Sequence, residues 1–363
     1  MALLINDLKR RQDAVAAEVR AALERVLARG WFILGPEVEA FEGEFAAACG
    51  VSACVGVGNG TDALELALRA VGAGPGDEVA TVANAGYYST TAIRAAGATP
   101  VYVDVEAGPM NMDAGALQAA LGQSTRAVIV THLYGQMAEM PALLEVTARA
   151  GVPVIEDCAQ AHGASLGGRP AGSWGVAGCF SFYPTKNLGA LGDGGAVVTS
   201  DGAVAERVRR LRQYGWREKY RCGLEGGRNS RLDELQAAVL RAQLPRLPAW
   251  NERRRVIARA YSEALRRAPV AVPEKFGEDY VAHLYVIRTP RRDELRAALM
   301  ARGIVAEVHY PVPDHRQEPA RLLVALPVTE QLSREVLTLP CFPELSDAEV
   351  EMVSRAVREF FES

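Results

Sequence analysis

Short apolar runs alternate with longer amphipathic stretches through the first half of the chain. The runs are typical of buried strands and lie at residues 53–57, 79–82, 100–105, 127–131, 153–156, 179–183 and 196–199. Several are followed by apolar residues at helical spacing, as in 89–96, 113–121 and 141–150. This alternation predicts an α/β fold with a mainly parallel sheet covered by helices on both faces.

The pattern changes at both ends of this region. Helical spacing over residues 13–29 predicts a helix before the sheet. Beyond residue 199 we expect a helix over 201–214, a polar loop over 215–230 and a helix over 231–244. A strand at 283–289, a helix at 293–302, a strand at 305–309 and a final helix opened by Ser346 then predict a smaller α+β lobe. We therefore expect a large domain over 1–244, including the N-terminal helical segment, and a small C-terminal domain over 245–363.

Composition narrows the class of protein. The chain has 363 residues, of which 49% are apolar, and a formal net charge of −4, which fits an ordinary two-lobed globular protein. The absence of a basic run predicts no binding to nucleic acid or to an anionic membrane surface. We see no secretory leader and no membrane-spanning apolar run, so a cytoplasmic protein is expected. Six cysteines without Cys-x-x-Cys spacing are typical of free buried thiols, and we expect no metal site.

One lysine follows directly after an apolar, aromatic strand. Pro184 ends the strand at 179–183, so Lys186 lies on a loop just beyond it. Four glycines, at positions 189, 192, 194 and 195, allow the backbone to turn tightly and approach a ligand. A lysine in an apolar, glycine-lined pocket has a lowered pKa and can form a Schiff base. The alternative interpretation is a solvated loop lysine.

A carboxylate and a glycine turn precede this lysine. The apolar strand 153–156 leads directly into Asp157, and a carboxylate at such a strand end needs a partner. A pyridinium nitrogen is one such partner, while a helix N-cap or a metal ligand remains open, with His162 as the only nearby second ligand. The turn Gly58-Asn-Gly-Thr61 joins a strand to a helix, a geometry that suits either a phosphate or a plain tight turn.

Together these residues form a candidate pyridoxal phosphate site, and the sequence resembles the DegT/DnrJ/EryC1/StrS family of sugar-nucleotide aminotransferases. The resemblance covers essentially the whole chain. It is carried by Gly-Thr-Asp-Ala-Leu (60–64), Gly-Pro-Gly-Asp-Glu-Val (74–79), His-Leu-Tyr-Gly (132–135), Glu-Asp-Cys-Ala-Gln-Ala-His (156–162), Ser-Phe-Tyr-Pro-Thr-Lys-Asn-Leu-Gly (181–189), Gly-Asp-Gly-Gly (192–195), Asn-Ser-Arg-Leu-Asp-Glu-Leu-Gln-Ala (229–237) and His-Tyr-Pro (309–311). It implies an aspartate-aminotransferase-like fold of type I.

The resemblance also implies roles at the cofactor. Lys186 would bond covalently to the cofactor aldehyde and shuttle a proton, and Asp157 would hold the pyridine nitrogen. Gln160 would lie near the 3-hydroxyl group of the ring. The phosphate would be held by Gly60, Thr61 and Ser181.

A homodimer is implied as well. Asn229 would reach the phosphate in the partner subunit, so the loop 215–230 would serve the neighbouring site. The candidate contacts to substrate are His162, Tyr183, Lys219, Tyr220, His309 and Tyr310.

Two positions bear on the ring and on the outcome of the reaction. Many relatives place an aromatic residue where this chain has Gly86, so Tyr87 or Tyr88 would stack on the pyridine ring instead. Relatives that remove a C3 hydroxyl group have histidine where this chain has Lys186, which favours transamination.

The activity implied is transfer of an amino group, with glutamate as donor, to a keto-6-deoxysugar carried on a nucleotide. The stretches 132–135 and 229–241 are most similar to enzymes that aminate C3 of dTDP-linked sugars. Amination of 4-keto sugars, a dehydratase and a relative that binds the cofactor without turnover remain as alternatives.

Overall fold

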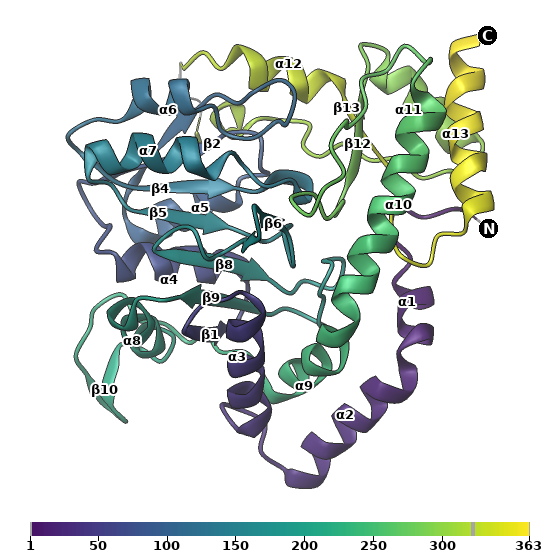
Figure 1. Cartoon of the computed structure of the whole chain (residues 1–363). Helices are drawn as coiled ribbons and strands as arrows, with labels where there is room; N and C mark the ends of the chain where they lie inside the picture. The colour runs from purple at the N-terminus through teal and green to yellow at the C-terminus, as the bar shows by residue number, and fades with distance from the viewer. Residues whose placement is uncertain (1, 321–323, 363) are drawn as a thin grey trace.

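A twisted, mainly parallel sheet lies at the centre of the larger lobe of this computed structural model, which describes residues 2–320 and 324–362 (Figure 1). In spatial order its strands are β1 (Ala53–Val57), β9 (Gly195–Thr199), β8 (Ala177–Ser181), β5 (Val154–Asp157), β4 (Thr125–Thr131), β2 (Glu78–Val82) and β3 (Thr99–Val103). Strand β9 is antiparallel to both β1 and β8, while the pairs from β8 to β3 are parallel. The predicted α/β class with a mainly parallel sheet is confirmed.

Helices cover both faces of this sheet because its strands are apolar on both sides. One face carries α4 (Gly60–Ala70), α5 (Tyr88–Ala96) and α8 (Gly202–Leu211). The other carries α3 (Pro36–Ala48), α6 (Ala114–Ala120) and α7 (Met140–Ala150). Along β4, Val128 and Val130 join the second core while Ile129 joins the first, as the two-residue period of a strand requires.

A helical frame links the sheet to the second lobe. The predicted helix over 13–29 is two helices, α1 (Leu8–Ala14) and α2 (Ala16–Arg29), because the backbone leaves helical geometry at Val15. Helix α2 packs along α9 (Glu234–Gln243), which a short 3₁₀ turn, η2 (Leu244–Arg246), joins to α10 (Leu247–Leu265). No helix in the described ranges is both long and apolar enough to cross a membrane.

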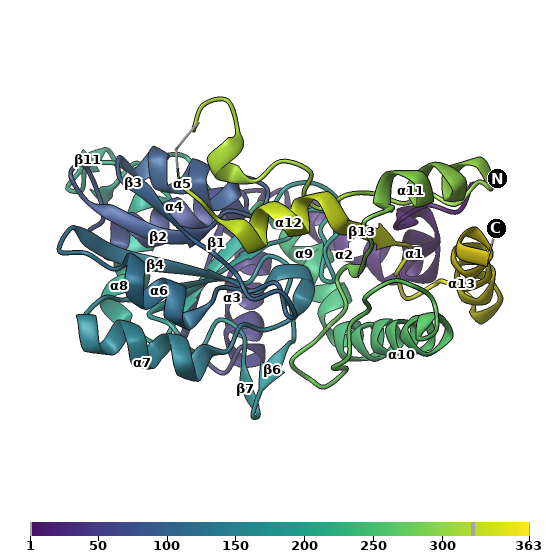
Figure 2. The same cartoon turned by 90° about the horizontal axis from the view of Figure 1, so that it is seen from above.

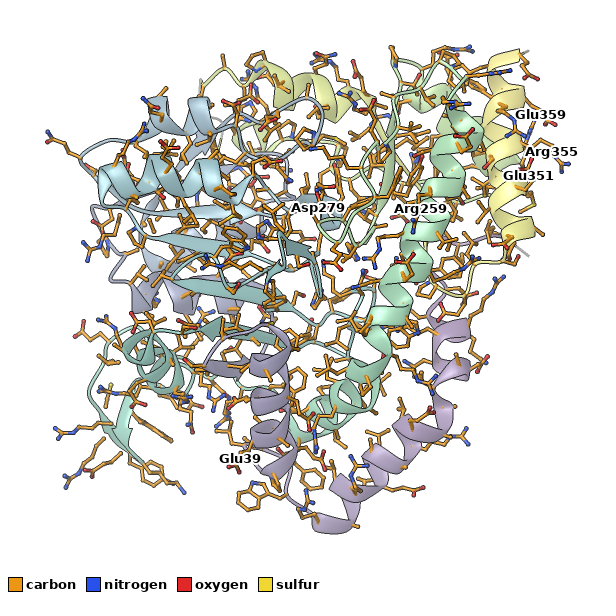
Figure 3. The ribbon with its side chains drawn as sticks, viewed as in Figure 1. Glu39, Arg259, Asp279, Glu351, Arg355 and Glu359 are labelled. Carbon is orange, nitrogen blue, oxygen red and sulfur yellow. The ribbon has the colours of Figure 1, made fainter. Side chains whose placement is uncertain are left out.

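The second lobe has its own core around a two-stranded antiparallel sheet (Figure 2). Its elements are β12 (Tyr285–Arg288), α11 (Arg292–Ala301), β13 (Val336–Leu339) and α13 (Asp347–Glu362). The C-terminal part of the chain also contains η3 (Asp314–Arg316) and α12 (Pro327–Glu335), and α12 packs against the large lobe instead, where Leu332 joins the sheet core. Helix α13 turns Glu351, Arg355 and Glu359 outward (Figure 3). Since α10 begins in the core of the large sheet and ends in this core, the boundary at 244/245 stays a prediction.

The prediction of a strand over 305–309 is wrong. Strand β12 pairs instead with β13, and the structure has isolated bridges from Ile304, just before the segment, to Leu3 and from Glu307, in its middle, to Thr338. The apolar pattern there reflects burial of Ile304 and Ala306, which a strand and an irregular segment satisfy equally well.

The first residues of the chain cross from the second lobe to the loop that follows β8. The N–H of Cys341 donates to the carbonyl of Ile5. The side chain of Asn6 donates to the Thr185 carbonyl, and Arg11, which is almost completely buried, donates to the carbonyls of Lys186 and Asn187. The N-terminal segment therefore holds the loop that carries Lys186.

Candidate active site

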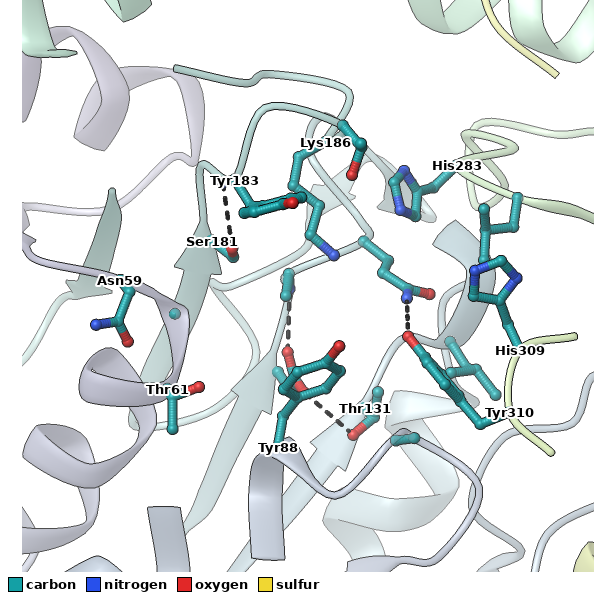
Figure 4. A pocket seen from close by; sticks show the side chains of 18 of the residues that line it. Asn59, Thr61, Tyr88, Thr131, Ser181, Tyr183, Lys186, His283, His309 and Tyr310 are labelled. Atoms are coloured by element: carbon teal, nitrogen blue, oxygen red, sulfur yellow. Dashed lines mark hydrogen bonds between the residues drawn. The ribbon is translucent and has the colours of Figure 1, made fainter. Parts of the chain in front are cut away.

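A cavity of about 670 Å³ opens beyond the carboxyl ends of β4, β5 and β8, between the two lobes (Figure 4). Ligands of open parallel sheets bind at this edge. The cavity is lined from both lobes and by the N-terminal segment, and its polar lining includes Asn59, Thr61, Thr131, Asp157, Gln160, Ser181, Tyr183, Lys186, Asp193, His283, Glu307, His309 and Tyr310.

Lys186 and Asp157 lie together in this cavity. Asp157 is the last residue of β5 and pairs in register with Cys179 of β8, whose strand leads into the Lys186 loop. Burial lowers the pKa of the Lys186 amine to about 8, and the charge of Asp157 opposes that shift. A lysine with such a pKa is partly unprotonated at neutral pH, as a nucleophile or a base requires.

The Asp157 carboxylate is almost completely buried and, among the described residues, accepts two hydrogen bonds, from the Ala159 N–H at 3.1 Å and from the Thr131 hydroxyl group at 3.5 Å. Burial raises its pKa. It forms no ion pair with any described residue. A buried carboxylate without a cation is stabilised by a cationic ligand, so the site fits a protonated pyridine nitrogen.

The start of α4 and the end of β8 form a cup that suits a phosphate. Asn59 caps α4 by accepting from the Asp62 N–H at 2.8 Å, and Thr61 and the Ser181 side chain line the cavity beside this helix end. A Cβ on Gly60 would lie 2.6 Å from the Ser181 Cβ, so only glycine permits this approach. Helix N-termini attract anions, so the predicted role of these residues fits the geometry.

Of the two tyrosines proposed for stacking, the structure places only Tyr88 in the cavity lining. Tyr87 adopts a left-handed backbone conformation (φ 71°) and lies outside the lining, with Arg94 over its ring. Gly86, also at positive φ, leaves the room that Tyr88 and Tyr310 fill, because a Cβ there would lie 2.8–2.9 Å from both rings. The aromatic side chain that lines the cavity here thus comes from Tyr88, two positions after the one at which many relatives carry it.

Asp314 holds this wall from the second lobe. Its carboxylate accepts from the Tyr87 N–H at 2.9 Å and from the Thr90 hydroxyl group at 2.7 Å, so it closes the first turn of α5. Burial raises the pKa of Asp314 to about 6. On the other side, Gln160 donates to the Tyr310 hydroxyl group at 3.2 Å and accepts from the Tyr134 N–H at 2.6 Å.

The candidate substrate contacts divide into two groups. Tyr183, His309 and Tyr310 line the cavity. Burial lowers the pKa of His309 to about 4, and its Nδ1 lies 2.8 Å from the Thr338 hydroxyl group.

His162 does not belong to the site. It is fully buried, outside the cavity lining, and packs against Phe180 and Phe182. Burial lowers its pKa to about 3. The backbone that follows Asp157 turns the side chain away from the cavity and into the apolar core, which sequence spacing alone does not show.

Lys219, Tyr220 and Asn229 lie away from the cavity of their own chain. The loop expected over 215–230 contains a short hairpin, β10 (Trp216–Glu218) and β11 (Arg221–Cys222), and all three residues are exposed. A second small hairpin, β6 (Ser165–Leu166) and β7 (Arg169–Pro170), lies elsewhere on the surface.

Sequence reasoning missed several residues of the lining. His283 and Glu307 come from the second lobe, and Asn6 comes from the N-terminal segment. No local pattern marks them, since each reaches the cavity through long-range packing. Asn59 did carry a signal, because an asparagine before the first turn of a helix is a common N-cap.

One cluster outside the cavity has the composition of a metal site. His132, Glu156 and Cys158 lie close together and are buried. The Glu156 carboxylate already accepts from the N–H groups of Gly172, Trp174 and Gly175, at 2.7–2.9 Å, and from His132 Nε2 at 3.0 Å. The Ala138 N–H donates to His132 Nδ1 at 3.1 Å. These hydrogen bonds account for the cluster as a structural network.

Comparison with known proteins gives consistent matches over the whole chain. The DegT/DnrJ/EryC1/StrS aminotransferase family matches residues 13–358. The dTDP-3-amino-3,4,6-trideoxy-alpha-D-glucose transaminase of Streptomyces venezuelae is 47% identical, over 98% of this chain and 95% of the relative. The crystal structure of S. venezuelae DesV in complex with a ketimine intermediate superposes with a TM-score of 0.97 at 46% identity, covering 100% of this chain and 99% of that one. NtdA from Bacillus subtilis, with bound cofactor PMP, gives 0.91 at 27% identity, covering 96% and 82%.

The phosphate cup generates a prediction that does not depend on turnover. Replacing Gly60 by Ala forces its Cβ against Ser181, so we expect the dissociation constant for pyridoxal phosphate to rise at least about 10-fold, since overpacking costs roughly 1–3 kcal/mol. Absorbance titration of the cofactor-free protein measures it. Gly43→Ala, in α3 with nothing near its Cβ, is the matched control and should bind normally. Equal affinity of the two variants would contradict the cup.

Proposed function

The chain belongs to the DegT/DnrJ/EryC1/StrS aminotransferase family, and from that premise we propose that it transfers an amino group from glutamate to C3 of a keto-6-deoxysugar linked to dTDP. The family depends on pyridoxal phosphate. The observation that carries the proposal is the pairing of Lys186 with the buried Asp157 in one cavity, in a chain so similar to a dTDP-sugar transaminase.

The residues of the cavity divide the chemistry among them. When bound, pyridoxal phosphate supplies an electron sink that weakens the bonds at the carbon bearing the amino group. Asp157 would balance the charge of the ring nitrogen, and Lys186 Nζ would take the proton from the donor carbon and deliver it to the cofactor. Gly60, Thr61 and Ser181 would hold the phosphate, Gln160 would lie near the 3-hydroxyl group, and Tyr88 would pack on the ring.

The position of amination rests on the relatives. The S. venezuelae transaminase is named for a 3-amino sugar, which supports C3 over C4. The lysine at 186 supports transamination over dehydration, because relatives that remove a C3 hydroxyl group have histidine there.

The proposal includes a homodimer with shared sites. Lys186 is the only lysine or arginine among the described residues that line the cavity, yet a nucleotide diphosphate requires cationic partners. Lys219 and Asn229 lie on an exposed segment with no task in their own cavity. In a two-fold dimer this segment would complete the partner's site, with Lys219 and Tyr220 at the substrate and Asn229 at the cofactor phosphate.

We also propose a cytoplasmic location. Cys49, Cys54, Cys158, Cys179 and Cys341 are buried free thiols and Cys222 is an exposed one, a state that a reducing compartment maintains.

The function is tested with purified protein, glutamate and a panel of 3-keto and 4-keto sugar nucleotides on dTDP and UDP. We expect a 3-amino product from the dTDP-linked 3-keto sugar, identified by mass and NMR. A product aminated only at C4 would refute the C3 assignment, and loss of the C3 oxygen would indicate a dehydratase.

Substituting Asp157 by Asn should leave the fold intact and lower kcat at least about 100-fold, a loss of about 3 kcal/mol of transition-state stabilisation, because an amide does not balance a ring cation. The measurement is steady-state turnover of cofactor-loaded protein with matched circular dichroism. Near-normal turnover would argue against the role of Asp157.

Shared sites predict complementation between two inactive variants. Asn229→Asp is isosteric and repels the partner's cofactor phosphate, while Lys186→Ala removes the reactive amine. Random exchange between these variants gives half mixed dimers with one intact site each, so about a quarter of full activity should return.

The control mixes Lys186→Ala with Asp157→Asn, two defects in the same chain's cavity, where each mixed site keeps one defect. No recovery in the first mixture, with subunit exchange demonstrated by mass spectrometry, would refute the shared site.

A further inference from the structure

His283 faces the cavity with one ring nitrogen and is held from behind by a chain of buried side chains. It is almost fully buried, and it reaches the cavity from the segment just before β12 (Figure 4). Its Nδ1 lies 3.0 Å from the side-chain oxygen of Asn187, the residue that follows Lys186. The nitrogen that forms the other end of the ring, Nε2, has no hydrogen-bond partner among the described residues.

A backbone carbonyl, which can only accept a hydrogen bond, fixes the orientation of the Asn187 amide. Its amide nitrogen lies 3.0 Å from the carbonyl oxygen of Val281 and 2.9 Å from Oδ1 of Asn251. Asn251 in turn donates to the carbonyl of His162 at 2.8 Å. Because a backbone carbonyl is only an acceptor, both amides point one way, and the Asn187 oxygen must face His283.

This chain determines which ring nitrogen carries the proton. An oxygen facing Nδ1 accepts, so Nδ1 carries the hydrogen and Nε2 of the neutral ring presents a lone pair to the cavity. The ring stays neutral because it is desolvated and surrounded by cationic or ionisable groups, namely Lys186, Arg254, His162 and His309, which together hold its pKa well below the usual range.

The group in the cavity that needs such an acceptor is the lysine. When Lys186 takes up a proton it becomes an ammonium with three N–H groups in a desolvated site, which is unfavourable without partners. Asp157 is committed to the ring nitrogen once the cofactor is bound. The Gln160 side-chain oxygen already accepts from Tyr134, and His309 is bonded to Thr338 through Nδ1 and has Nε2 3.6 Å from the Glu307 carboxylate.

We propose that His283 Nε2 is the hydrogen-bond acceptor that stabilises the protonated amine of Lys186. It would do so after the amine has taken the proton and before the amine delivers it. The inference rests on the proposed function, in which Lys186 shuttles a proton, and it makes His283 a positioning residue that acts through the lysine. Asn187 then couples the lysine loop to the second lobe, because it follows Lys186 in the chain and its side chain orients the imidazole ring of His283.

Two substitutions of His283 distinguish the role of its Nδ1 from that of its Nε2. His283→Asn keeps a donor near the position of Nδ1, and hence the hydrogen bond to Asn187, but removes the acceptor that faces the cavity. His283→Gln reaches the position of Nε2 and restores an acceptor there. His309→Asn is the matched control, a second histidine of the lining whose nitrogens both face other partners.

The measurement is the pKa of the Lys186 amine in the full-length protein loaded with pyridoxamine phosphate, in which the lysine is free and Asp157 is committed to the ring nitrogen, by NMR of ¹³C- and ¹⁵N-labelled lysine. The sequence has only Lys9, Lys186, Lys219 and Lys275, and the other three are exposed, so Lys186 is resolved by its lower pKa. His283→Asn should lower this pKa by about one unit, a tenfold change in the ammonium-to-amine ratio, because hydrogen bonds to charged groups are strong. His283→Gln and His309→Asn should leave it close to that of the unsubstituted protein.

A second measurement needs no substitution. ¹⁵N NMR of the five histidines should show His283 as a neutral ring protonated at Nδ1 and not titrating between about pH 5 and pH 8. A ring protonated at Nε2, or an unchanged lysine pKa in His283→Asn, would overturn the inference. An enzyme that is active with sugar nucleotides but shows either result contradicts only the role of His283, whereas inactivity with every substrate contradicts the proposed function.

Discussion

The parallel pairing of β5 with β8 is the constraint on which the site depends. Asp157 and Cys179 are partners in register, so the two strands end at the same edge of the sheet. One strand end supplies a carboxylate, and the chain beyond the other supplies an amine. Because β9 returns antiparallel beside β8, its first residue, Gly195, lies against the residue that caps α4, and a Cβ on Gly195 would lie 2.4 Å from the Asn59 backbone. The order of the strands in the sheet thus brings the amine, the carboxylate and the phosphate cup together.

This origin explains why the centre of the site could be predicted from the sequence. Lys186 and Asp157 follow strands that are readable from apolar runs, and the rule for parallel sheets places their ends together. The choice between Tyr87 and Tyr88 was not readable, because it depends on two successive left-handed backbone conformations and on Asp314 from the other lobe. The direction of His162 depends on the turn after β5, and the role of residues 305–309 depends on which strand β12 selects as partner. Local pattern specifies elements, whereas these features arise where elements from distant segments meet.

The cavity of a single chain is rich in acceptors and poor in cations. Carboxylates from Asp157, Asp193 and Glu307 line it beside one lysine, while arginines and a lysine project from the β10–β11 hairpin into solvent. A single chain therefore has a pocket with little positive charge and, apart from that pocket, an exposed hairpin that carries Arg217, Lys219 and Arg221. The lowered pKa of Lys186 in this cavity therefore comes from its burial and not from neighbouring cations, and the charge of Asp157 opposes the shift.

The contacts of the N-terminal segment have a consequence for the synthesis of the protein. A ribosome produces Arg11 before Lys186, but Leu3 finds its partner only when Ile304 has been synthesised, and Ile5 only when Cys341 has. The large sheet can assemble before the N-terminal segment has made these contacts, because the strands of the sheet lie between residues 53 and 199. The loop of Lys186 therefore receives its full support only when the last part of the chain closes over the first. A chain that is still incomplete can thus form its sheet before this support exists, and before His283, Glu307 and His309 have reached the cavity.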